Sequence, residues 1–169
     1  MSAAPDVALA EVRSPSGGYV VGTDDDGVVR LVAWAEDFVC PPGARWDPDV
    51  AGPAAAALGS FLHGESRTVG VTYSLEGVSG FRRDVLAAVA EIPWGETWTY
   101  GEVAAEVGSP LAARAVGSAC RANPVPVVVP CHRVVAAGGL GGFGRGYGCL
   151  DRKRALLRLE GHTRPDWGI

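Results

Sequence analysis

Apolar and polar positions follow two different patterns in the two halves of the chain. Up to about residue 78, short stretches rich in Val, Tyr and Trp alternate with turn residues, which is typical of β-structure. The turn 24–27 ends in Asp-Gly, a strong hairpin signal. An Ala-rich stretch with apolar spacing predicts a short helix at 53–63, and the Pro-, Gly- and Asp-rich segment 41–53 predicts a loop. The predicted strands are 18–23, 28–34 and 68–74.

From residue 80 onward the spacing becomes helical. A first amphipathic helix opens at Gly80-Phe81. A second begins at Thr99 with Glu102 three residues later, a capping box, and stops at Gly108. A third starts at Ser109-Pro110, because Pro suits a first helical turn, and runs to about Cys120. Two short helices joined by a Gly turn indicate a helix-turn-helix. One face of the first helix carries Val85, Leu86, Val89 and Ile92.

The change of pattern predicts two domains, a β-rich one at 1–78 and a mainly helical one at 79–169. The chain has 169 residues, 47% hydrophobic and 20% charged, as in ordinary globular proteins. No apolar run is long enough to span a bilayer, so we expect no membrane partner. The first residues lack the basic and apolar regions of a signal peptide, which favours a cytoplasmic location.

Four scattered cysteines argue against a metal site. They stand at Cys40, Cys120, Cys131 and Cys149, without a Cys-x-x-Cys pair or a His at zinc-finger spacing. In a reducing compartment we expect free thiols and no bound metal. The acidic run 24–26 is interpreted as a solvated turn.

The net charge of −4 hides an asymmetry between the halves. Residues 1–78 carry four Arg against eleven Asp and Glu, a net charge of −7. Residues 79–169 carry eleven Arg and Lys against eight Asp and Glu, a net charge of +3. A polyanion such as nucleic acid would therefore meet the second half.

Cys131 and His132 form the strongest candidate for chemistry. They follow the apolar run 127–129, which predicts a buried strand ending at Pro130. A Cys is a nucleophile only as a thiolate, so its neighbours decide its use. An isolated pair of this kind is more often a structural Cys beside a surface His. The flanking motifs reverse that preference.

The third predicted helix consists almost entirely of small residues between 112 and 119, with Arg114 projecting from them. A slender helix with one long cation fits a nucleic-acid groove, including a narrow minor groove. Tight helix–helix packing favours the same composition. The local sequence leaves the two interpretations open.

Taken together, residues 81–161 resemble the O6-alkylguanine-DNA alkyltransferases, repair proteins that move an alkyl group from damaged guanine onto their own cysteine. The first 78 residues match only loosely. The resemblance implies an α+β fold, with an N-terminal β-rich ribonuclease H-like domain and a C-terminal domain carrying a helix-turn-helix of the winged-helix-like type. The motifs are 92–104 (IPWGETWTYGEVA), 112–117 (AARAVG), 123–126 (NPVP), 129–135 (VPCHRVV) and 156–161 (LLRLEG).

By this resemblance, Cys131 is the alkyl acceptor and His132 its base through a water. Glu160 orients the imidazole, and Asn123 braces the turn beside the active-site strand. Tyr100 donates a proton or hydrogen bond to the guanine leaving group. These roles form a nucleophile–base–orienter relay that needs no cofactor.

The resemblance also implies a partner, double-stranded DNA containing O6-alkylguanine, with O4-alkylthymine left open as a second lesion. The base is flipped out of the stack, Arg114 fills the space it leaves, and the protein acts as a monomer. The expected DNA-contacting residues are Arg114, Ala113, Ala115, Gly117, Tyr100, Thr99 and Arg121.

The expected substrate pocket has one unsettled wall. Val134 and Pro126 line it by resemblance, and the main-chain carbonyls of Cys131 and Val134 read the exocyclic amine of guanine. The Gly-rich loop 138–149 is about two residues longer than in the family, and either Phe143 or Tyr147 takes its aromatic position. The range of accepted alkyl groups depends on this loop.

Three other functions fit parts of the pattern. A non-reactive lesion-binding relative that recruits repair factors would lack the acceptor thiol, yet Cys131 is present. A transcriptional regulator would need a further DNA-binding or Cys-rich domain. A cysteine hydrolase with a Cys-His-Glu relay would need an oxyanion hole, which a sequence cannot display.

Overall fold

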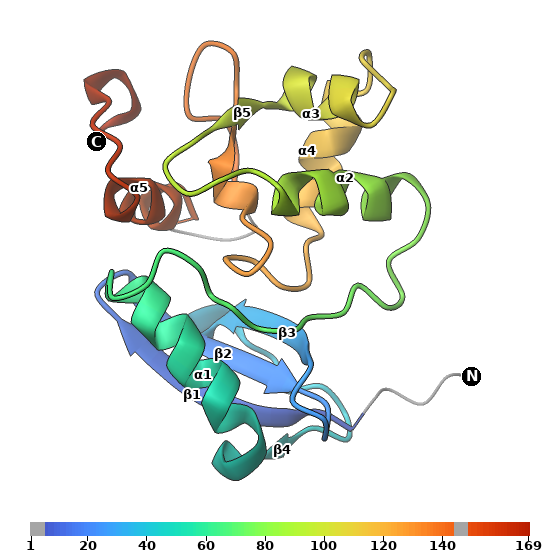
Figure 1. Cartoon of the computed structure of the whole chain (residues 1–169), viewed down its shortest axis with the longest axis vertical. Coiled ribbons are helices and arrows are strands. Elements are labelled where there is room, and N and C mark those ends of the chain that lie inside the picture. Colours follow the sequence, from blue (N-terminus) through green and yellow to red (C-terminus); the bar gives the residue numbers. More distant parts are fainter. Residues whose placement is uncertain (1–5, 144–148) are drawn as a thin grey trace. The chain divides into compact units, whose positions relative to one another are not determined.

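The computed structural model describes residues 6–143 and 149–169 and divides the chain into two compact units, Met1–Glu76 and Gly77–Ile169. The division falls two residues before the boundary expected at 78/79. Figure 1 shows that strands make up much of the first unit and that helices dominate the second. The fold is therefore mixed α+β. No helix among the described residues is long and apolar enough to cross a membrane.

Unit 1 is a four-stranded sheet with one helix against it. The strands are β1 (Ala8–Ser14), β2 (Gly17–Thr23), β3 (Val29–Trp34) and β4 (Arg45–Trp46), in the order β3-β2-β1-β4. β2 pairs antiparallel with β1 and β3, and β4 runs parallel to β1. The helix α1 (Pro48–Leu62) packs on β1 and β2 (Figure 1).

The predicted hairpin is confirmed, because β2 and β3 flank the turn at 24–27. The Asp24 carboxylate closes this turn by accepting the backbone N–H groups of Asp26 and Val28. It also forms an ion pair with Arg30, 2.8 Å long. Asp24 therefore does more than the solvated turn residue that was expected.

Three predictions for unit 1 were wrong. The helix starts at Pro48 rather than Pro53, because the Asp47 side chain caps it and Pro48 occupies its first position. The predicted loop at 41–53 thus contains β4 and the start of α1. The predicted strand at 68–74 forms a single bridge, between Tyr73 and Val29, and β1 was not predicted.

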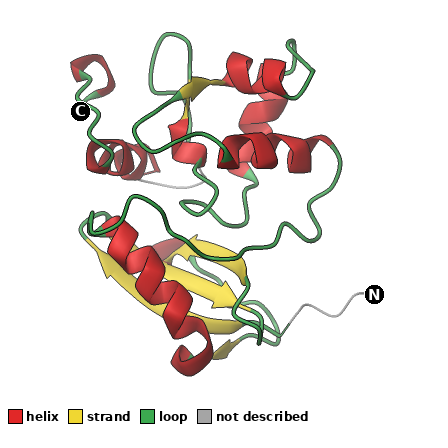
Figure 2. Ribbon diagram, viewed as in Figure 1, coloured by secondary structure: helices red, strands yellow, loops and turns green. Residues whose placement is uncertain are grey.

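Unit 2 combines helices with a small two-stranded parallel sheet (Figure 2). Strand β5 (Trp98–Thr99) pairs with β6 (Val134–Val135). Helix α4 (Ala113–Arg121) contacts α2 (Phe81–Ala90) and α3 (Tyr100–Glu106). The predicted capping box of Thr99 and Glu102 is present at the start of α3. The helices are α2 (Phe81–Ala90), α3 (Tyr100–Glu106), α4 (Ala113–Arg121) and α5 (Cys149–Leu159), with the 3-10 turns η2 (Cys131–Arg133) and η3 (Pro165–Trp167).

Two predictions for unit 2 were also wrong. The third helix begins at Ala113, because residues 109–112 form a turn closed by the Ala112 N–H and the Ser109 carbonyl. The apolar run 127–129 is no strand, since Val127 has a φ of 73° and the run is folded into turns. Three consecutive Val residues fit a buried turn here because two of them, Val127 and Val129, still enter the core.

Candidate active site

The short sheet brings the two best candidate segments together. Trp98 pairs with Val134 and Thr99 with Val135. Consequently the start of α3, with Tyr100, lies beside the segment that carries Cys131 and His132. The side chains of Cys131 and His132 are buried, with 4% and 0% of their surface exposed.

Glu160 is the buried acceptor of this segment. It follows the last residue of α5, where Gly161 adopts a left-handed φ of 88°. One of its carboxylate oxygens accepts His132 Nε2–H at 2.7 Å, and the Arg133 guanidinium donates to both oxygens at 2.9–3.1 Å. Burial opposes ionisation, but the bonds from His132 and Arg133 outweigh it and lower the pKa of Glu160 to about 2.

An ionised Glu160 fixes the tautomer of His132. Since the carboxylate can only accept, Nε2 carries the proton and Nδ1 is left with a lone pair. Burial lowers the pKa of His132, so the ring is neutral at rest. Nδ1 is buried without a hydrogen-bond partner among the described residues. The ring can therefore accept a proton at that atom.

Cys131 rests as a thiol. Burial raises the pKa of its thiol, whereas a hydrogen bond from Asn123 and the charge of Lys153 lower it. Asn123 Nδ2 donates to the Cys131 sulfur at 3.3 Å and to the Val129 carbonyl at 2.9 Å. Its Oδ1 accepts the Val125 N–H at 3.0 Å. The amide thus spans the turn that leads into η2, and the thiol needs a base to become a nucleophile.

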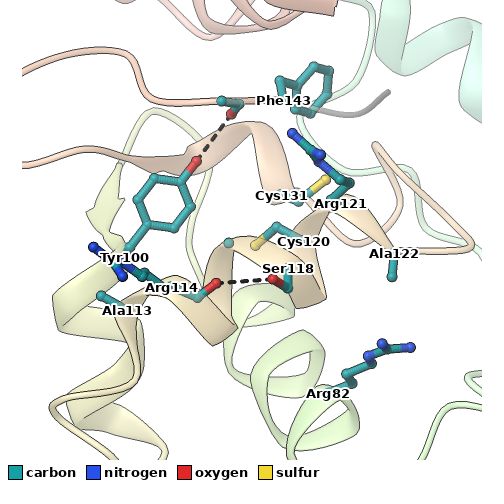
Figure 3. A pocket seen from close by; sticks show the side chains of 12 residues that line it. Arg82, Tyr100, Ala113, Arg114, Ser118, Cys120, Arg121, Ala122, Cys131 and Phe143 are labelled. Atoms are coloured by element: carbon teal, nitrogen blue, oxygen red, sulfur yellow. Dashed lines mark hydrogen bonds between the residues drawn. The ribbon is translucent and has the colours of Figure 1, made fainter. Parts of the chain in front are cut away.

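A cavity of about 680 Å³ opens onto Cys131. This volume lies in the range of small-molecule sites and accommodates a nucleobase. Figure 3 shows Tyr100 and Arg121 flanking the sulfur atoms of Cys131 and Cys120 in this view. The lining residues are Arg82, Tyr100, Ala113, Arg114, Gly117, Ser118, Cys120, Arg121, Ala122, Cys131, Gly142 and Phe143.

Tyr100 presents its hydroxyl at this cavity. The hydroxyl donates to the Gly142 carbonyl at 3.1 Å. Burial raises the pKa of Tyr100 to about 12, with the Cys120 charge acting in the same direction. The phenol therefore keeps its proton at neutral pH and remains a hydrogen-bond donor.

The cavity brings together seven of the residues expected from the sequence. Tyr100, Cys131, Arg114, Arg121, Ala113 and Gly117 all line it, and Phe143 supplies an aromatic wall. Thr99 caps α3, and Ala115 lies on α4 at an adjacent hollow with Ala119 and Arg82. Pro126 and Val134 do not line the cavity, and Tyr147 lies outside the described residues.

Sequence reasoning missed four residues of this region. Arg133 lies within the motif 129–135 and no role was predicted for it, although its guanidinium donates to Glu160. Arg82 reaches the cavity from α2, and Cys120 reaches it from α4. Helical spacing could have suggested this position for Cys120 but not for Arg82. Lys153 is a fully buried residue of α5, and no sequence signal separates it from Arg152, Arg154 and Arg158 on the same helix. No three potential metal ligands converge within the part of the chain that the structure describes.

Comparison with known proteins identifies the relatives of this chain. Residues 80–162 match the family model described as 6-O-methylguanine DNA methyltransferase, DNA binding domain. A methylated-DNA–protein-cysteine methyltransferase of Mycolicibacterium paratuberculosis is 46% identical over 157 residues, covering 91% of this chain and 92% of that protein. One from Methanosarcina acetivorans is 38% identical, covering 88% and 95%.

Solved structures agree. The crystal structure of Mycobacterium tuberculosis OGT in complex with DNA has a TM-score of 0.82 and 36% identity, covering 91% of this chain and 92% of that one. The O6-methylguanine-DNA methyltransferase of Pyrococcus kodakaraensis has a TM-score of 0.66 and 25% identity, covering 92% and 99%. With its cavity, its buried thiol and this likeness over nearly its whole length, the chain belongs to the methylated-DNA–protein-cysteine methyltransferase family.

Proposed function

We propose that this protein repairs DNA by transferring the alkyl group of O6-alkylguanine irreversibly to Cys131, one group per protein molecule and without a cofactor. The observation that carries the proposal is a single cavity. Cys131 opens into the same space as Tyr100 and Arg114, and the residue after it, His132, is hydrogen-bonded to Glu160. Family membership over nine-tenths of the chain supports the same reaction.

The reaction follows from the protonation states at rest. Glu160 holds His132 Nε2–H, so Nδ1 takes the Cys131 proton through a water molecule. The thiolate attacks the alkyl carbon, a C–S bond forms, and the bond between that carbon and O6 breaks. The electron pair passes to the guanine, and Tyr100, protonated at neutral pH, stabilises it by turning its single O–H from the Gly142 carbonyl to the base. The thioether product has no route back to a thiol.

Guanine recognition would use the residues around the thiol. The carbonyls of Cys131 and Val134 would accept from the exocyclic amine, with Phe143 as the aromatic wall. Pro126 would complete the alkyl side together with Tyr147, which lies beyond the described residues. Asn123 would keep the turn before Cys131 in place, as its three hydrogen bonds allow.

Double-stranded DNA would bind along α3 and α4, which we assign to a helix-turn-helix of the winged-helix-like type. O6 lies within the paired stack, so the base must be flipped out, at a cost of a few kcal/mol. Arg114 would fill the vacated space, while Ala113, Ala115 and Gly117 let α4 approach the minor groove. Thr99, Tyr100 and Arg121 would contact the strand nearby.

Four finer assignments complete the proposal. The first unit would be a ribonuclease H-like structural domain, and the second would hold both DNA binding and chemistry. The protein would act as a monomer in the cytoplasm. O4-alkylthymine would be a second substrate, since it carries the same kind of exocyclic O-alkyl group.

The test uses a duplex with one O6-methylguanine labelled in its methyl group, followed by intact mass and peptide mapping. The label should reach Cys131 and be lost in Cys131→Ala. Cys40→Ser, which removes an exposed thiol of the first unit, is the matched control and should react like the unmodified chain. Binding of the duplex without transfer would overturn the proposal in favour of a lesion-binding protein.

A further inference from the structure

The chain ends in a short tail, residues 161–169, and the chemistry above gives this tail no role. Within the tail only Trp167 is buried, with 6% of its surface exposed, while its neighbours Asp166 and Gly168 are exposed. An indole ring buries a large apolar surface compared with most other side chains. The tail is therefore anchored to unit 2 mainly through this ring.

Trp167 belongs to a small apolar cluster that reaches the segments around the active site. The other buried members of the cluster are Val135 on β6, Leu140 in the Gly-rich loop and Leu157 on α5. Ile169 packs against the cluster from the end of the tail. Neither Trp167 nor Val135 nor Leu140 lines the cavity. The cluster therefore supports the strand and the loop and leaves the substrate space free.

The strand and the loop supported by the cluster both hold Tyr100. Val135 pairs with Thr99, the residue before Tyr100. Gly141 follows Leu140 in the loop, and a Cβ on it would lie 2.8 Å from the Tyr100 ring and 3.0 Å from its hydroxyl oxygen. The next residue, Gly142, accepts the Tyr100 hydroxyl through its carbonyl. A shift of either segment would therefore move the phenol.

Contacts from α5 and from the tail itself fix the position of the Trp167 ring. Arg154 Nε donates to the Trp167 carbonyl at 2.8 Å, and Arg158 donates to the Gly168 carbonyl at 2.6 Å. The Arg164 guanidinium lies 4.4 Å from the centre of the ring, within the range of cation–π attraction. The indole Nε1–H is buried without a hydrogen-bond partner among the described residues. The ring therefore acts on the cluster through packing and not through a hydrogen bond of its own.

We propose that Trp167 is a positioning residue for alkyl transfer: packed in one cluster with Val135 and Leu140, it holds β6 and the start of the Gly-rich loop where they present the Tyr100 hydroxyl to the cavity. Such a residue touches neither the thiol nor the base, and its effect on the reaction passes through Tyr100. This inference rests on the proposed function for its substrate but not for its effect on the strand and the loop.

The test compares Trp167→Ala, which removes the ring, with Trp167→Phe, which keeps an aromatic ring without the unpaired N–H. Trp46→Ala is the matched control, because it makes the same change at an exposed ring of the first unit. Each variant is also made together with Tyr100→Phe, which removes the hydroxyl. Three quantities are measured: the rate of transfer from free O6-benzylguanine, the rate at which iodoacetamide alkylates Cys131, and the hydrogen exchange of the amides that pair β5 with β6.

Trp167→Ala should slow transfer by about tenfold or more, because a displaced hydroxyl stabilises the leaving guanine poorly. Iodide leaves without such a hydrogen bond, so iodoacetamide should alkylate Cys131 at a rate within about threefold of that of the unmodified chain. In the Tyr100→Phe background the same change should slow transfer by less than about threefold, since residues that act through one group are not additive. The β5–β6 amides should exchange faster in Trp167→Ala. Trp167→Phe should recover most of the transfer rate, and Trp46→Ala should change none of the three quantities.

A folded Trp167→Ala that transfers at the unmodified rate would overturn the inference. So would an equal loss with and without the Tyr100 hydroxyl, or a general opening of the site seen as alkylation of Cys131 by iodoacetamide about tenfold faster or more. If Trp167→Ala does not fold, Trp167→Leu supplies the same comparisons with part of the packing retained. Absence of transfer in the unmodified chain would refute the proposed function. The β5–β6 amides would still test Trp167 in that case, because unchanged exchange in Trp167→Ala would refute its support of the strand.

Discussion

Glu160 is the residue on which the active site depends most. Its carboxylate accepts His132 and Arg133, and one oxygen also accepts the Gly95 N–H at 3.3 Å. It therefore joins the end of α5 to η2 and to the loop before β5. The same negative charge orients the base and neutralises a guanidinium that is itself buried. Structure and chemistry are coupled through this one side chain.

Glu160→Gln should impair both stability and reaction. The amide leaves Arg133 as a buried charge without its counterion, which destabilises the folded state by roughly 3 kcal/mol. His132 also loses the anion that stabilises its protonated form during transfer. Urea unfolding and the rate of transfer to Cys131 measure the two effects. Stability and rate equal to those of the unmodified chain would contradict the account of Glu160.

Acid should destabilise the protein through the same pair. The folded-state pKa values of His132 and Glu160 both lie below their ordinary values of 6.5 and 4.5, so the unfolded chain binds more protons. Their contribution is present at neutral pH. It declines below pH 6.5 for His132 and is lost between pH 4.5 and about 2 for Glu160. Unfolding in urea across this range should show a falling free energy, with a shallower fall in Glu160→Gln. A constant free energy from pH 7 to pH 3 would refute the assignment.

For single residues, the sequence predicted those functional positions that lie in a recognisable motif. Cys131 and His132 were named from one segment and Glu160 from another, and the structure brings His132 and Glu160 together. Lys153 could not be named, because its burial is a property of how α5 packs and its spacing resembles that of the neighbouring Arg residues. Arg133 lies in the motif 129–135, but its partner Glu160 is 27 residues away and could not be predicted from the local sequence.

Among helices and turns, the predictions were correct where the stabilising hydrogen bonds come from residues nearby in the sequence. The capping box of α3 and the hairpin turn before β3 both use contacts a few residues apart, and both were predicted. The predicted strands at 68–74 and 127–129 do not form. Hydrophobic periodicity and composition cannot show whether a neighbouring strand has free N–H and C=O groups for a segment to pair with. The start of α4 was missed since Ser109 closes a turn instead of capping the helix.

The start of the Gly-rich loop 138–149 can be tested by substituting one of its glycines. Gly141 has a φ of 74°, and a Cβ there would lie 2.8 Å from the Tyr100 ring and 3.0 Å from the Ala136 nitrogen. Gly141→Ala should therefore displace the loop and Tyr100 and slow transfer from free O6-benzylguanine by about tenfold or more. Gly138→Ala, where a Cβ meets no atom within 4 Å, is the control and should react normally. Equal rates for both variants would show that the loop does not position Tyr100.

At the scale of the whole molecule, charge is divided between the two units. The acidic half carries the sheet, while three Arg side chains, Arg82, Arg114 and Arg121, surround the cavity in the other. The sequence predicted this asymmetry from counting alone. It could not place Arg82 at the cavity, because that depends on how α2 packs against α4.

Arg114 and Arg82 should therefore differ in effect on DNA. Arg114→Ala should slow repair of a duplex far more than reaction with a free base, because only the duplex needs its base flipped. Arg82→Ala should weaken binding to all duplexes alike and reduce the salt dependence of binding by about one phosphate contact. Binding titrations at several salt concentrations and repair rates on both substrates measure this. An equal loss on free base and duplex for Arg114→Ala would contradict its role in the stack.

The most direct test of the account is the stoichiometry of transfer. The protein is mixed with a growing excess of duplex carrying labelled O6-methylguanine, and bound label is counted by intact mass and assigned by peptide mapping. We expect a plateau at one methyl group per chain, all of it on Cys131, with no further repair after fresh duplex is added. Continued turnover beyond one equivalent, or a plateau with the methyl group on Cys120, would contradict it.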